Sequence, residues 1–341
     1  MPNSCSHSLK AFNTLGLDQH CRDWLVAETT EQLIHECSQA VDNDLPLLIL
    51  GGGSNLVLCE DFDGLVVKVS TQGITVTEDI KHFYLSVAAG EDWHALVEYT
   101  LEHRIYGLEN LALIPGTTGA APMQNIGAYG VEFCDVCDWV EYFDLETKQF
   151  IKLTASECRF EYRDSIFKQS LKNKAVITQV GIKLAKDWQP QLSYGPLQQL
   201  VNTINAHTIF DTVCEVRRSK LPDPSVIGNA GSFFKNPIIS NETYQHLLLE
   251  HPDVVAYPHG NQIKLAAGWL IDKVGLKGHC LGQAGVHDKQ ALVLINRGHA
   301  TGKDITTLAN YIIMTIKAQF NVSLEIEPRL IGRTGEISIH G

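Results

Sequence analysis

Residues 45–56 read Leu45-Pro46-Leu47-Leu48-Ile49-Leu50-Gly51-Gly52-Gly53-Ser54-Asn55-Leu56, a short apolar run that leads directly into three glycines. A run of this length, ended by glycine, predicts a buried strand followed by a tight loop. Consecutive glycines let a ligand approach their backbone N–H groups closely, and Ser54 and Asn55 add side-chain donors, so the loop suits a phosphate. The alternative is a plain turn. The G-x-G-x-x-G fingerprint and the P-loop lysine are both absent, which argues against a Rossmann or P-loop fold.

A second loop, residues 115–130, is rich in small residues: twelve of its sixteen positions are Gly, Ala, Pro, Thr or Asn. It reads Pro115-Gly116-Thr117-Thr118-Gly119-Ala120-Ala121-Pro122-Met123-Gln124-Asn125-Ile126-Gly127-Ala128-Tyr129-Gly130. Such a segment cannot form a core of its own, but its backbone can approach a flat or extended ligand, on which Tyr129 could stack. Long loops inside compact domains are usually functional, so we favour a binding loop over an idle surface loop.

Composition excludes several classes of protein. The chain has 341 residues, with 27 Lys and Arg against 39 Asp and Glu, and a formal net charge of −12. Without a basic cluster we expect no nucleic-acid partner. No apolar stretch reaches the length of a membrane helix, and the first residues lack the pattern of a signal peptide, so we expect no membrane association.

The cysteines indicate a reducing compartment. Nine are scattered along the chain, and the only close pair is Cys134-x-x-Cys137, without a second pair or histidines at metal spacing. This pattern favours ordinary reduced thiols and a cytoplasmic protein with no metal site, with a redox or metal role for the pair as the alternative.

Hydrophobic periodicity predicts an α+β chain of two or three domains. Its first part mixes helices and strands, its middle is strand-rich, and Pro222 and Pro224 mark a break before a C-terminal α/β unit that begins near residue 219. The expected helices are 30–41, one starting after the N-cap Asp92, 241–250, 264–274 and 304–320, and the expected strands are 45–50, 65–69, 83–87, 139–145, 175–184 and 324–331.

Three further motifs could carry chemistry. Arg163, in the segment 159–168, could hold a carboxylate through its two-pronged guanidinium, although a surface charge alternation is the alternative. Ser232, in the segment 228–237, follows a glycine and could be exposed for proton transfer, but no G-x-S-x-G elbow surrounds it and a simple turn is the alternative. On a strand, Glu325, Glu327 and Arg329 would share one face, either as a functional row or as a salt-bridged edge.

Taken together and in this order, the motifs resemble the family of UDP-N-acetylenolpyruvoylglucosamine reductases, also called UDP-N-acetylmuramate dehydrogenases (MurB), in the longer of its two types. The resemblance covers nearly the whole chain. It is carried by Asn13-Thr14-Leu15-Gly16, by the loops 51–55 and 115–130, and by 162–167, 228–237, Lys264-Leu265-Ala266-Ala267-Gly268-Trp269-Leu270-Ile271-Asp272 and Glu327-x-Arg329.

The resemblance implies FAD and NADPH as cofactors and a two-part flavin fold of the vanillyl-alcohol-oxidase (PCMH) type, followed by an α/β substrate domain. It places one FAD subdomain at 1–68, a second at 69–218 joined by about 320–341, and the substrate domain at 219–319. The FAD-binding positions that it implies are Gly51, Gly52, Gly53, Ser54, Asn55, Pro115, Gly116, Gly119, Asn125, Gly127, Tyr129 and Arg329.

The resemblance also implies the reaction. NADPH would reduce FAD, N5 of the reduced flavin would deliver hydride to C3 of the enolpyruvyl group of UDP-N-acetylglucosamine enolpyruvate, and Ser232 would protonate C2. Arg163 and Glu327 match the positions that stabilise the developing enolate. A serine is a weak acid, so we expect it to need a hydrogen-bond partner or a nearby cation. Tyr194, Lys220, Asn236 and Gln290 match positions that bind the substrate.

One motif departs from the family. The family ends on Glu-Pro-Glu-Val-Arg, whereas this chain has Glu325-Ile326-Glu327-Pro328-Arg329. Pro328 restricts Glu327 to extended dihedrals, which a strand accepts, so we assign the role to Glu327 rather than Glu325. If Glu327 donates a hydrogen bond it must be protonated, which would need burial to raise its pKa.

Two other functions compete with this interpretation. An alcohol or aldehyde oxidase of the same flavin fold would explain the loops 51–55 and 115–130, but not the segment 232–236 or the Glu327/Arg329 ending. A non-catalytic flavin- or nucleotide-sugar-binding protein would have no need of Arg163, Ser232 and Glu327 together. We therefore expect a monomeric reductase acting on a small molecule; no site for a 2′-phosphate distinguishes NADPH from NADH.

Overall fold

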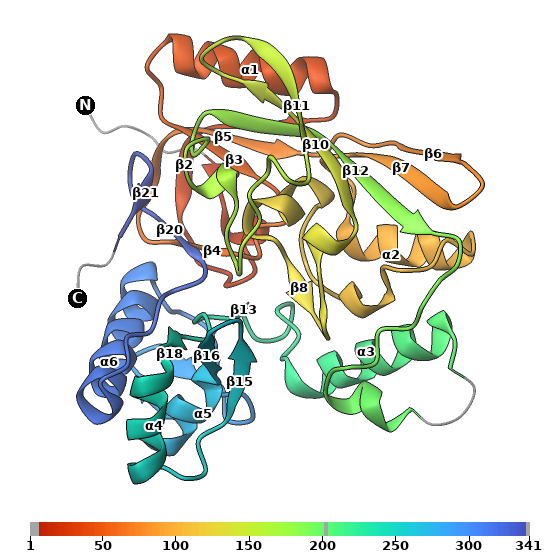
Figure 1. Ribbon diagram of the computed structural model, residues 1–341. Coiled ribbons are helices and arrows are strands. Elements are labelled where there is room, and N and C mark those ends of the chain that lie inside the picture. The colour runs from red at the N-terminus through yellow and green to blue at the C-terminus, as the bar shows by residue number, and fades with distance from the viewer. Residues whose placement is uncertain (1–6, 201–203, 339–341) are drawn as a thin grey trace, which may run out of the picture. The chain divides into compact units, whose positions relative to one another are not determined.

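The computed structural model describes residues 7–200 and 204–338 (Figure 1). The chain divides into two compact units. Unit 1 contains residues 1–22, 53–63 and 220–341, and unit 2 contains residues 23–52 and 64–219. The glycine loop 51–53 thus passes from unit 2 into unit 1 between Gly52 and Gly53.

A five-stranded antiparallel sheet forms the centre of unit 2. Side chains alternate along its strands, and those facing inward, such as Val87, Val140 and Val180, are fully buried. Burying each such side chain stabilises the fold by about 1.5–3 kcal/mol. The order of strands is β11 (Gln149–Thr154), β10 (Cys137–Asp144), β12 (Ala175–Ala185), β7 (His82–Ala88) and β6 (Ile74–Glu78).

The rest of unit 2 carries the loops of interest. The predicted strand before the glycines is β3 (Leu47–Leu50), which pairs in parallel with β5 (Phe62–Val69). Asp92 caps helix α2 (Trp93–Glu102), as predicted, by accepting a hydrogen bond from the Ala95 N–H at 2.8 Å. The remaining elements are α1 (Thr30–Asp42), η2 (Glu109–Leu111), η3 (Thr118–Gln124), β8 (Gly127–Ala128), β9 (Val131–Glu132), η4 (Phe133–Asp135), η5 (Ile166–Lys168), η6 (Gly195–Gln199) and α3 (Ala206–Lys220).

Unit 1 consists of small sheets and three longer helices. Helix α6 (Gly302–Phe320) starts with a capping box between Thr301 and Asp304, and one apolar face of it is buried, made of Ile305, Leu308, Ile312, Ile316 and Phe320. One sheet has the order β13 (Asn229–Ser232), β19 (Val293–Asn296), β18 (Ala284–Val286) and β17 (Cys280–Leu281). Another has β14 (Ile238–Ile239), β16 (Gln262–Leu265) and β15 (Ala256–His259), and the other helices are α4 (Asn241–Glu250) and α5 (Ala267–Lys273).

A third sheet joins the first loop to the end of the chain. Strand β4 (Leu56–Leu58), directly after the glycine loop, pairs in parallel with β20 (Arg329–Ile331), and β20 pairs with β21 (Glu336–Ile337). The N-terminal β1 (His7–Ser8) pairs with the start of β2 (His20–Ala27).

Two sequence-based boundaries were wrong. The helix predicted at 264–274 begins only at Ala267, because residues 262–265 form β16 between β14 and β15. The strand predicted at 324–331 is regular only from Arg329. Before it, Ile326 forms an isolated bridge with Phe234, and Pro328 has no N–H to continue a ladder. The division into three domains at 68, 218 and 319 stays a prediction. Among the described residues, no helix combines the length and apolar character needed to cross a membrane.

Candidate functional site

In unit 2, the start of the glycine loop lies against the beginning of the 115–130 loop. A Cβ placed on Gly52 would come within 2.7 Å of the Gly116 Cα, so only glycine allows this approach. The Lys68 ammonium donates a hydrogen bond to the Gly51 carbonyl at 2.7 Å, and burial lowers the pKa of this lysine. Lys68 was not singled out in the sequence; a lysine inside an otherwise apolar strand was its only signal.

In unit 1, the end of the glycine loop is held by the segment 12–16. Gly53 has φ +64°, and a Cβ there would overlap the Phe12 carbonyl. Both the backbone conformation and the close approach therefore require glycine at this position. The Thr14 N–H donates to the Gly53 carbonyl at 3.1 Å, and the Asn55 carbonyl accepts from the Arg329 N–H at 3.0 Å. The first loop and the C-terminal motif, far apart in sequence, are therefore neighbours in the structure.

The 115–130 loop is fixed by a buried asparagine. Asn125 is fully buried with φ +46°, and its side chain donates to a Glu132 carboxylate oxygen at 2.9 Å and to the Glu161 carbonyl at 3.2 Å. The same side chain accepts from the Cys134 N–H at 2.9 Å. Asn125 thus shapes the loop and joins it to the segment that carries Arg163.

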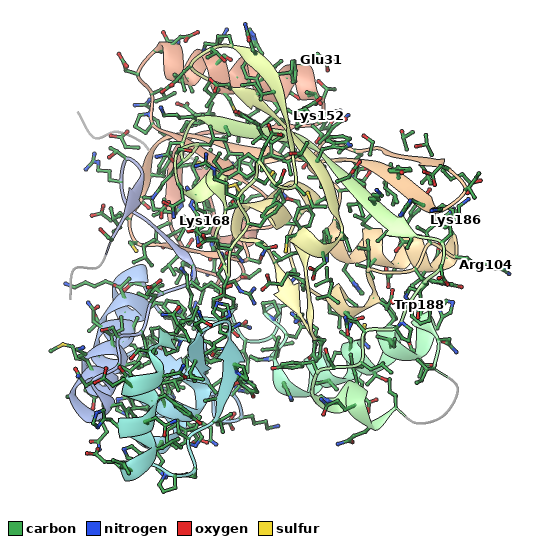
Figure 2. All side chains as sticks on the ribbon, in the orientation of Figure 1. Glu31, Arg104, Lys152, Lys168, Lys186 and Trp188 are labelled. Carbon is green, nitrogen blue, oxygen red and sulfur yellow. The ribbon has the colours of Figure 1, made fainter. Side chains whose placement is uncertain are left out.

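Arg163 lies beside that loop. Its guanidinium donates to the Gly127 carbonyl at 3.1 Å and lies over the Tyr162 ring, 5.1 Å from the centroid. The residue adopts φ +57°, a strained conformation for arginine, and its carbonyl accepts from the Lys168 ammonium at 3.1 Å (Lys168 is labelled in Figure 2). The geometry therefore connects Arg163 with Gly127, a predicted FAD-binding position.

Tyr194, the predicted substrate residue, lies next to Tyr129. Their rings meet edge to face with centroids 5.9 Å apart, and 46% of Tyr194 is exposed. Buried Asn110 donates to the carbonyls of Tyr129 at 2.9 Å and Gln191 at 3.0 Å, which ties both tyrosine segments to one amide group. Asn110 was missed in the sequence because nothing in its spacing separates it from a loop residue.

Glu109, next to Asn110, is also buried. Its carboxylate accepts from the Trp188 indole N–H at 2.6 Å and from the Gly107 N–H at 2.7 Å (Trp188 is labelled in Figure 2). The turn η2 therefore anchors the chain that leads to Tyr194.

Ser232 ends strand β13 in unit 1. The pairing with β19 shifts by one residue between Asn229 and Ser232, which is a β-bulge. Ser232 is exposed, whereas Phe233 and Phe234, directly after it, are buried. The hydrogen-bond partner that we expected for the serine hydroxyl is not found among the residues the structure describes.

Glu325 and Glu327 differ in their surroundings. Glu325 is exposed and its carboxylate pairs with the Lys235 ammonium at 3.0 Å. Glu327 is half-buried, and its N–H donates to the Phe233 carbonyl at 2.9 Å, which places it across from the residue after Ser232. The Arg329 guanidinium pairs with Glu336 at 3.0 Å. The three residues that were predicted to share one face therefore have different partners: Glu325 pairs with Lys235, the Glu327 N–H bonds to the Phe233 carbonyl, and Arg329 pairs with Glu336.

Two of the predicted substrate residues meet at the start of α5. The Asn236 side chain accepts from the Ala267 N–H at 3.0 Å, and the Gln290 amide oxygen lies 3.7 Å from where a Cβ on Gly268 would be. Lys220 is exposed at the last residue of α3.

The Cys134/Cys137 pair shows no sign of reactivity. Burial raises the pKa of both thiols, and the described cysteines are all free. Within residues 7–200 and 204–338, no group of three or more His, Cys, Asp or Glu side chains could hold a metal ion.

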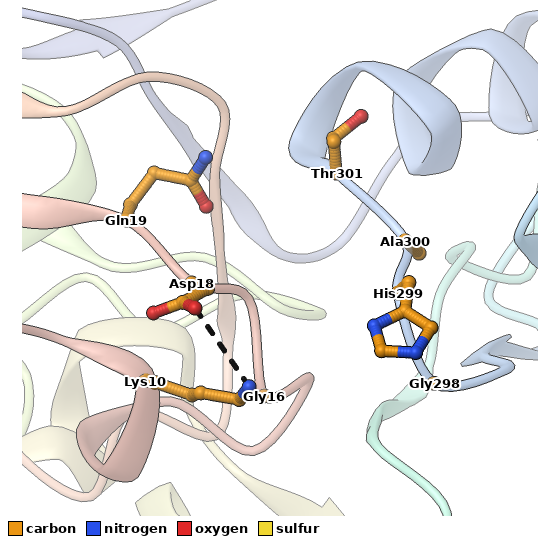
Figure 3. A pocket seen from close by; sticks show the side chains of 8 residues that line it. All are labelled: Lys10, Gly16, Asp18, Gln19, Gly298, His299, Ala300 and Thr301. Carbon is orange, nitrogen blue, oxygen red and sulfur yellow. Dashed lines mark ion pairs between the residues drawn. The ribbon is translucent and has the colours of Figure 1, made fainter.

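Figure 3 shows a small pocket in unit 1 that includes Gly16 of the segment 12–16. Its Lys10 and Asp18 form an ion pair at 3.8 Å, and the Gln19 amide oxygen is buried without a hydrogen-bond partner among the described residues. The lining residues are Lys10, Gly16, Asp18, Gln19, Gly298, His299, Ala300 and Thr301, none of which is a predicted site residue.

Two known protein families match parts of this chain. An FAD-binding domain family matches residues 24–149, and the C-terminal domain family of UDP-N-acetylenolpyruvoylglucosamine reductase matches residues 223–331. The two matches together confirm an α+β flavin-binding fold with a further C-terminal domain.

Several relatives that align with nearly the whole chain share one name. A UDP-N-acetylenolpyruvoylglucosamine reductase of Shewanella baltica is 57% identical over 98% of this chain and 98% of its own, and one of Vibrio cholerae is 50% identical over 97% and 96%. The crystal structure of this reductase from Thermus caldophilus matches with a TM-score of 0.65 and 25% identity, over 95% of this chain and 97% of that one. The chain therefore belongs to the UDP-N-acetylenolpyruvoylglucosamine reductase (MurB) family.

Proposed function

We propose that Arg163, Ser232 and Glu327 are the catalytic residues with which this chain performs the reaction of its family. The chain is an NADPH-dependent flavoprotein that reduces UDP-N-acetylglucosamine enolpyruvate to UDP-N-acetylmuramate in peptidoglycan precursor synthesis. One observation supports the assignment of residues: the Glu327 N–H is bonded to the Phe233 carbonyl at 2.9 Å, so the backbone of Glu327 is held in fixed register with the residue after the exposed Ser232.

The residues present fit FAD. The Thr14 and Thr118 hydroxyls are buried without hydrogen-bond partners among the described residues. Thr14 bonds through its N–H to Gly53, and Thr118 lies in the loop that packs on Gly52. Unpartnered donors beside a glycine loop that has no bulky side chains are suited to a diphosphate.

The residues that would hold FAD lie in three segments. The glycine loop would bind the diphosphate through backbone N–H groups, the 115–130 loop would lie along the flavin, and Arg329 would contribute from β20. These are the positions Gly51, Gly52, Gly53, Ser54, Asn55, Pro115, Gly116, Gly119, Asn125, Gly127, Tyr129 and Arg329.

Bound FAD, once reduced by NADPH, would supply a hydride to C3 of the enolpyruvyl group. The enolate that this leaves would then take a proton at C2 from Ser232, and Ser232 would regain one from solvent. The Arg163 guanidinium and a protonated Glu327 stabilise the negative charge that builds up on the enolate and carboxylate before C2 is protonated. The Arg163 guanidinium is already held by the Gly127 carbonyl, so it needs little reorganisation during the step.

The remaining residues would position the substrate. Lys220 offers an exposed ammonium to the diphosphate, while Asn236 and Gln290 present amide groups near the start of α5. Tyr194 offers a half-exposed ring that Tyr129 supports. The proposal includes a monomer, since every residue named belongs to one chain, and a cytoplasmic location, as the free thiols would require.

The test separates the two half-reactions. In Ser232→Ala, we expect NADPH to reduce the flavin at close to the normal rate, while reoxidation by UDP-N-acetylglucosamine enolpyruvate slows by about 10²–10⁴, the usual contribution of a general acid. Ser156→Ala is the matched control, because Ser156 is also exposed and its hydroxyl bonds to the nearby Thr154 hydroxyl at 3.0 Å. Equal losses in both half-reactions would show that Ser232 has a structural role only.

A further inference from the structure

The buried amide of Asn229 organises the strand that ends in Ser232. Asn229 is 4% exposed and uses its whole side chain. The amide nitrogen donates to the carbonyls of Pro222 at 3.0 Å and Ile227 at 2.9 Å, and the amide oxygen accepts from the Gly231 N–H at 2.9 Å. One side chain therefore binds both the segment after Lys220 and the residue before Ser232.

The bond to Gly231 stabilises the bulge in β13. Asn229 pairs with Ile295 and Ser232 with Val293, so three steps along β13 match two along β19. Gly231, inside the bulge, has φ +67°, a conformation that favours glycine.

The bulge decides which side chain faces outward. Side chains alternate between the two faces of a strand. Removing the extra residue of the bulge would therefore turn every later side chain of β13 to the opposite face. With the bulge in place Ser232 is exposed and Phe233 is buried, where its N–H donates to the Leu292 carbonyl at 2.7 Å. Without it, the serine would face away from solvent.

The rest of the surroundings keep Asn229 in place. Its backbone N–H donates to the Thr14 carbonyl at 2.9 Å. Buried Asn296 donates to the neighbouring Leu15 carbonyl at 2.9 Å. The motif at 13–16 therefore supports the Ser232 strand as well as Gly53.

We propose that Asn229 is a positioning residue for Ser232: its hydrogen bond to the Gly231 N–H holds the bulge that presents the serine hydroxyl to the substrate. The inference rests on the proposed role of Ser232 as the proton donor. It predicts that Asn229 affects only the half-reaction in which C2 receives its proton.

The first test is a double-mutant cycle on flavin reoxidation by UDP-N-acetylglucosamine enolpyruvate. We expect Asn229→Ala to slow reoxidation by about 10- to 100-fold, a part of what a general acid contributes, and to change flavin reduction by NADPH by less than about 3-fold. In the Ser232→Ala background, Asn229→Ala should add almost nothing, because the group that it positions is gone. Full additivity, or equal loss in both half-reactions, would overturn the inference.

A second pair of variants avoids disturbing the buried amide. Nothing lies within 4 Å of a Cβ on Gly231, so a side chain fits there and only the backbone conformation is disfavoured. Asparagine tolerates positive φ better than alanine does. We expect reoxidation rates in the order wild type, Gly231→Asn, Gly231→Ala, with the last at least about 10-fold below the first, and normal thermal unfolding midpoints to confirm folding. An alanine variant as fast as wild type would overturn the inference.

The outcomes also distinguish this inference from the proposed function. If reduced wild-type enzyme is not reoxidised by the enolpyruvyl substrate, or if Ser232→Ala reacts as fast as wild type, both the function and the inference fall. If wild type reacts, Ser232→Ala is slow and the cycle is additive, only the role of Asn229 is overturned.

Discussion

Replacing Glu327 and Glu325 by glutamine, one at a time, asks which of two neighbouring carboxyl groups takes part in the reaction. Both substitutions keep the size of the side chain and remove its ability to ionise or donate a carboxylic proton. The two residues lie two positions apart, so they are matched controls for each other.

The structure sets the size of each effect. Glu325 has a side chain that is 73% exposed, and its carboxylate forms an ion pair with the Lys235 ammonium at 3.0 Å. An exposed pair contributes about 0.2–1 kcal/mol, so Glu325→Gln should lower the free energy of unfolding by no more than that and slow reoxidation by less than about 5-fold. Removing one preorganised group from a developing negative charge costs about 10²–10³ in rate, which is what we expect of Glu327→Gln.

The assay is anaerobic stopped-flow absorbance. The enzyme is first reduced with NADPH and then mixed with UDP-N-acetylglucosamine enolpyruvate, and the return of the oxidised flavin spectrum gives the rate. Glu327→Gln should be slow in this step and normal in the first. A larger loss in Glu325→Gln would refute the assignment and show that the shifted proline had changed the position of the catalytic residue.

Three further predictions concern stability, the guanidinium and pH. Gly53→Ala should lower the free energy of unfolding by about 1–3 kcal/mol or prevent folding, because φ is positive and the new methyl group would overlap the Phe12 carbonyl; a denaturation midpoint equal to wild type would contradict this. Arg163→Lys keeps the charge but loses the planar fork that bonds Gly127, so reoxidation should slow by about 10-fold or more while flavin reduction does not; equal rates would show that charge alone suffices. Hydrogen bonds from the Lys81 and His82 N–H groups and the Tyr84 hydroxyl lower the pKa of Asp79 to about 2, so its stabilisation is present above the usual carboxyl pKa and is lost as pH falls through about 2. Urea midpoints between pH 4 and pH 2 should therefore fall more for wild type than for Asp79→Asn, and parallel curves would contradict the assignment.

Local signals in the sequence were enough to predict the longer elements. Helix α6 has both a capping residue and a regular apolar face, and Asp92 is the N-cap of α2. In both helices the periodicity and the capping residue therefore indicate the same element. They failed where distant pairing decides the outcome. Residues 264 and 265 were predicted to begin a helix, yet they belong to β16 (Gln262–Leu265), the central strand of a small sheet, and no local pattern contains that information.

The candidate site shows the same contrast between features with a local sequence signal and features that depend on distant contacts. Its motifs could be read from the sequence because glycine-rich loops and isolated charged residues have distinctive composition. Their supporting residues could not, since a buried asparagine such as Asn110 or Asn229 looks like any loop asparagine until its partners are known. Lys68 is similar, because only the fold shows that its ammonium reaches the Gly51 carbonyl.

The most direct test of the central claim is an anaerobic visible spectrum of the purified protein. NADPH is added first and UDP-N-acetylglucosamine enolpyruvate second. The account predicts a flavin spectrum that bleaches with NADPH and returns with the enolpyruvyl substrate. A flavin that bleaches but does not return would contradict the proposed substrate chemistry, and a colourless protein that takes up no added FAD would contradict the cofactor as well.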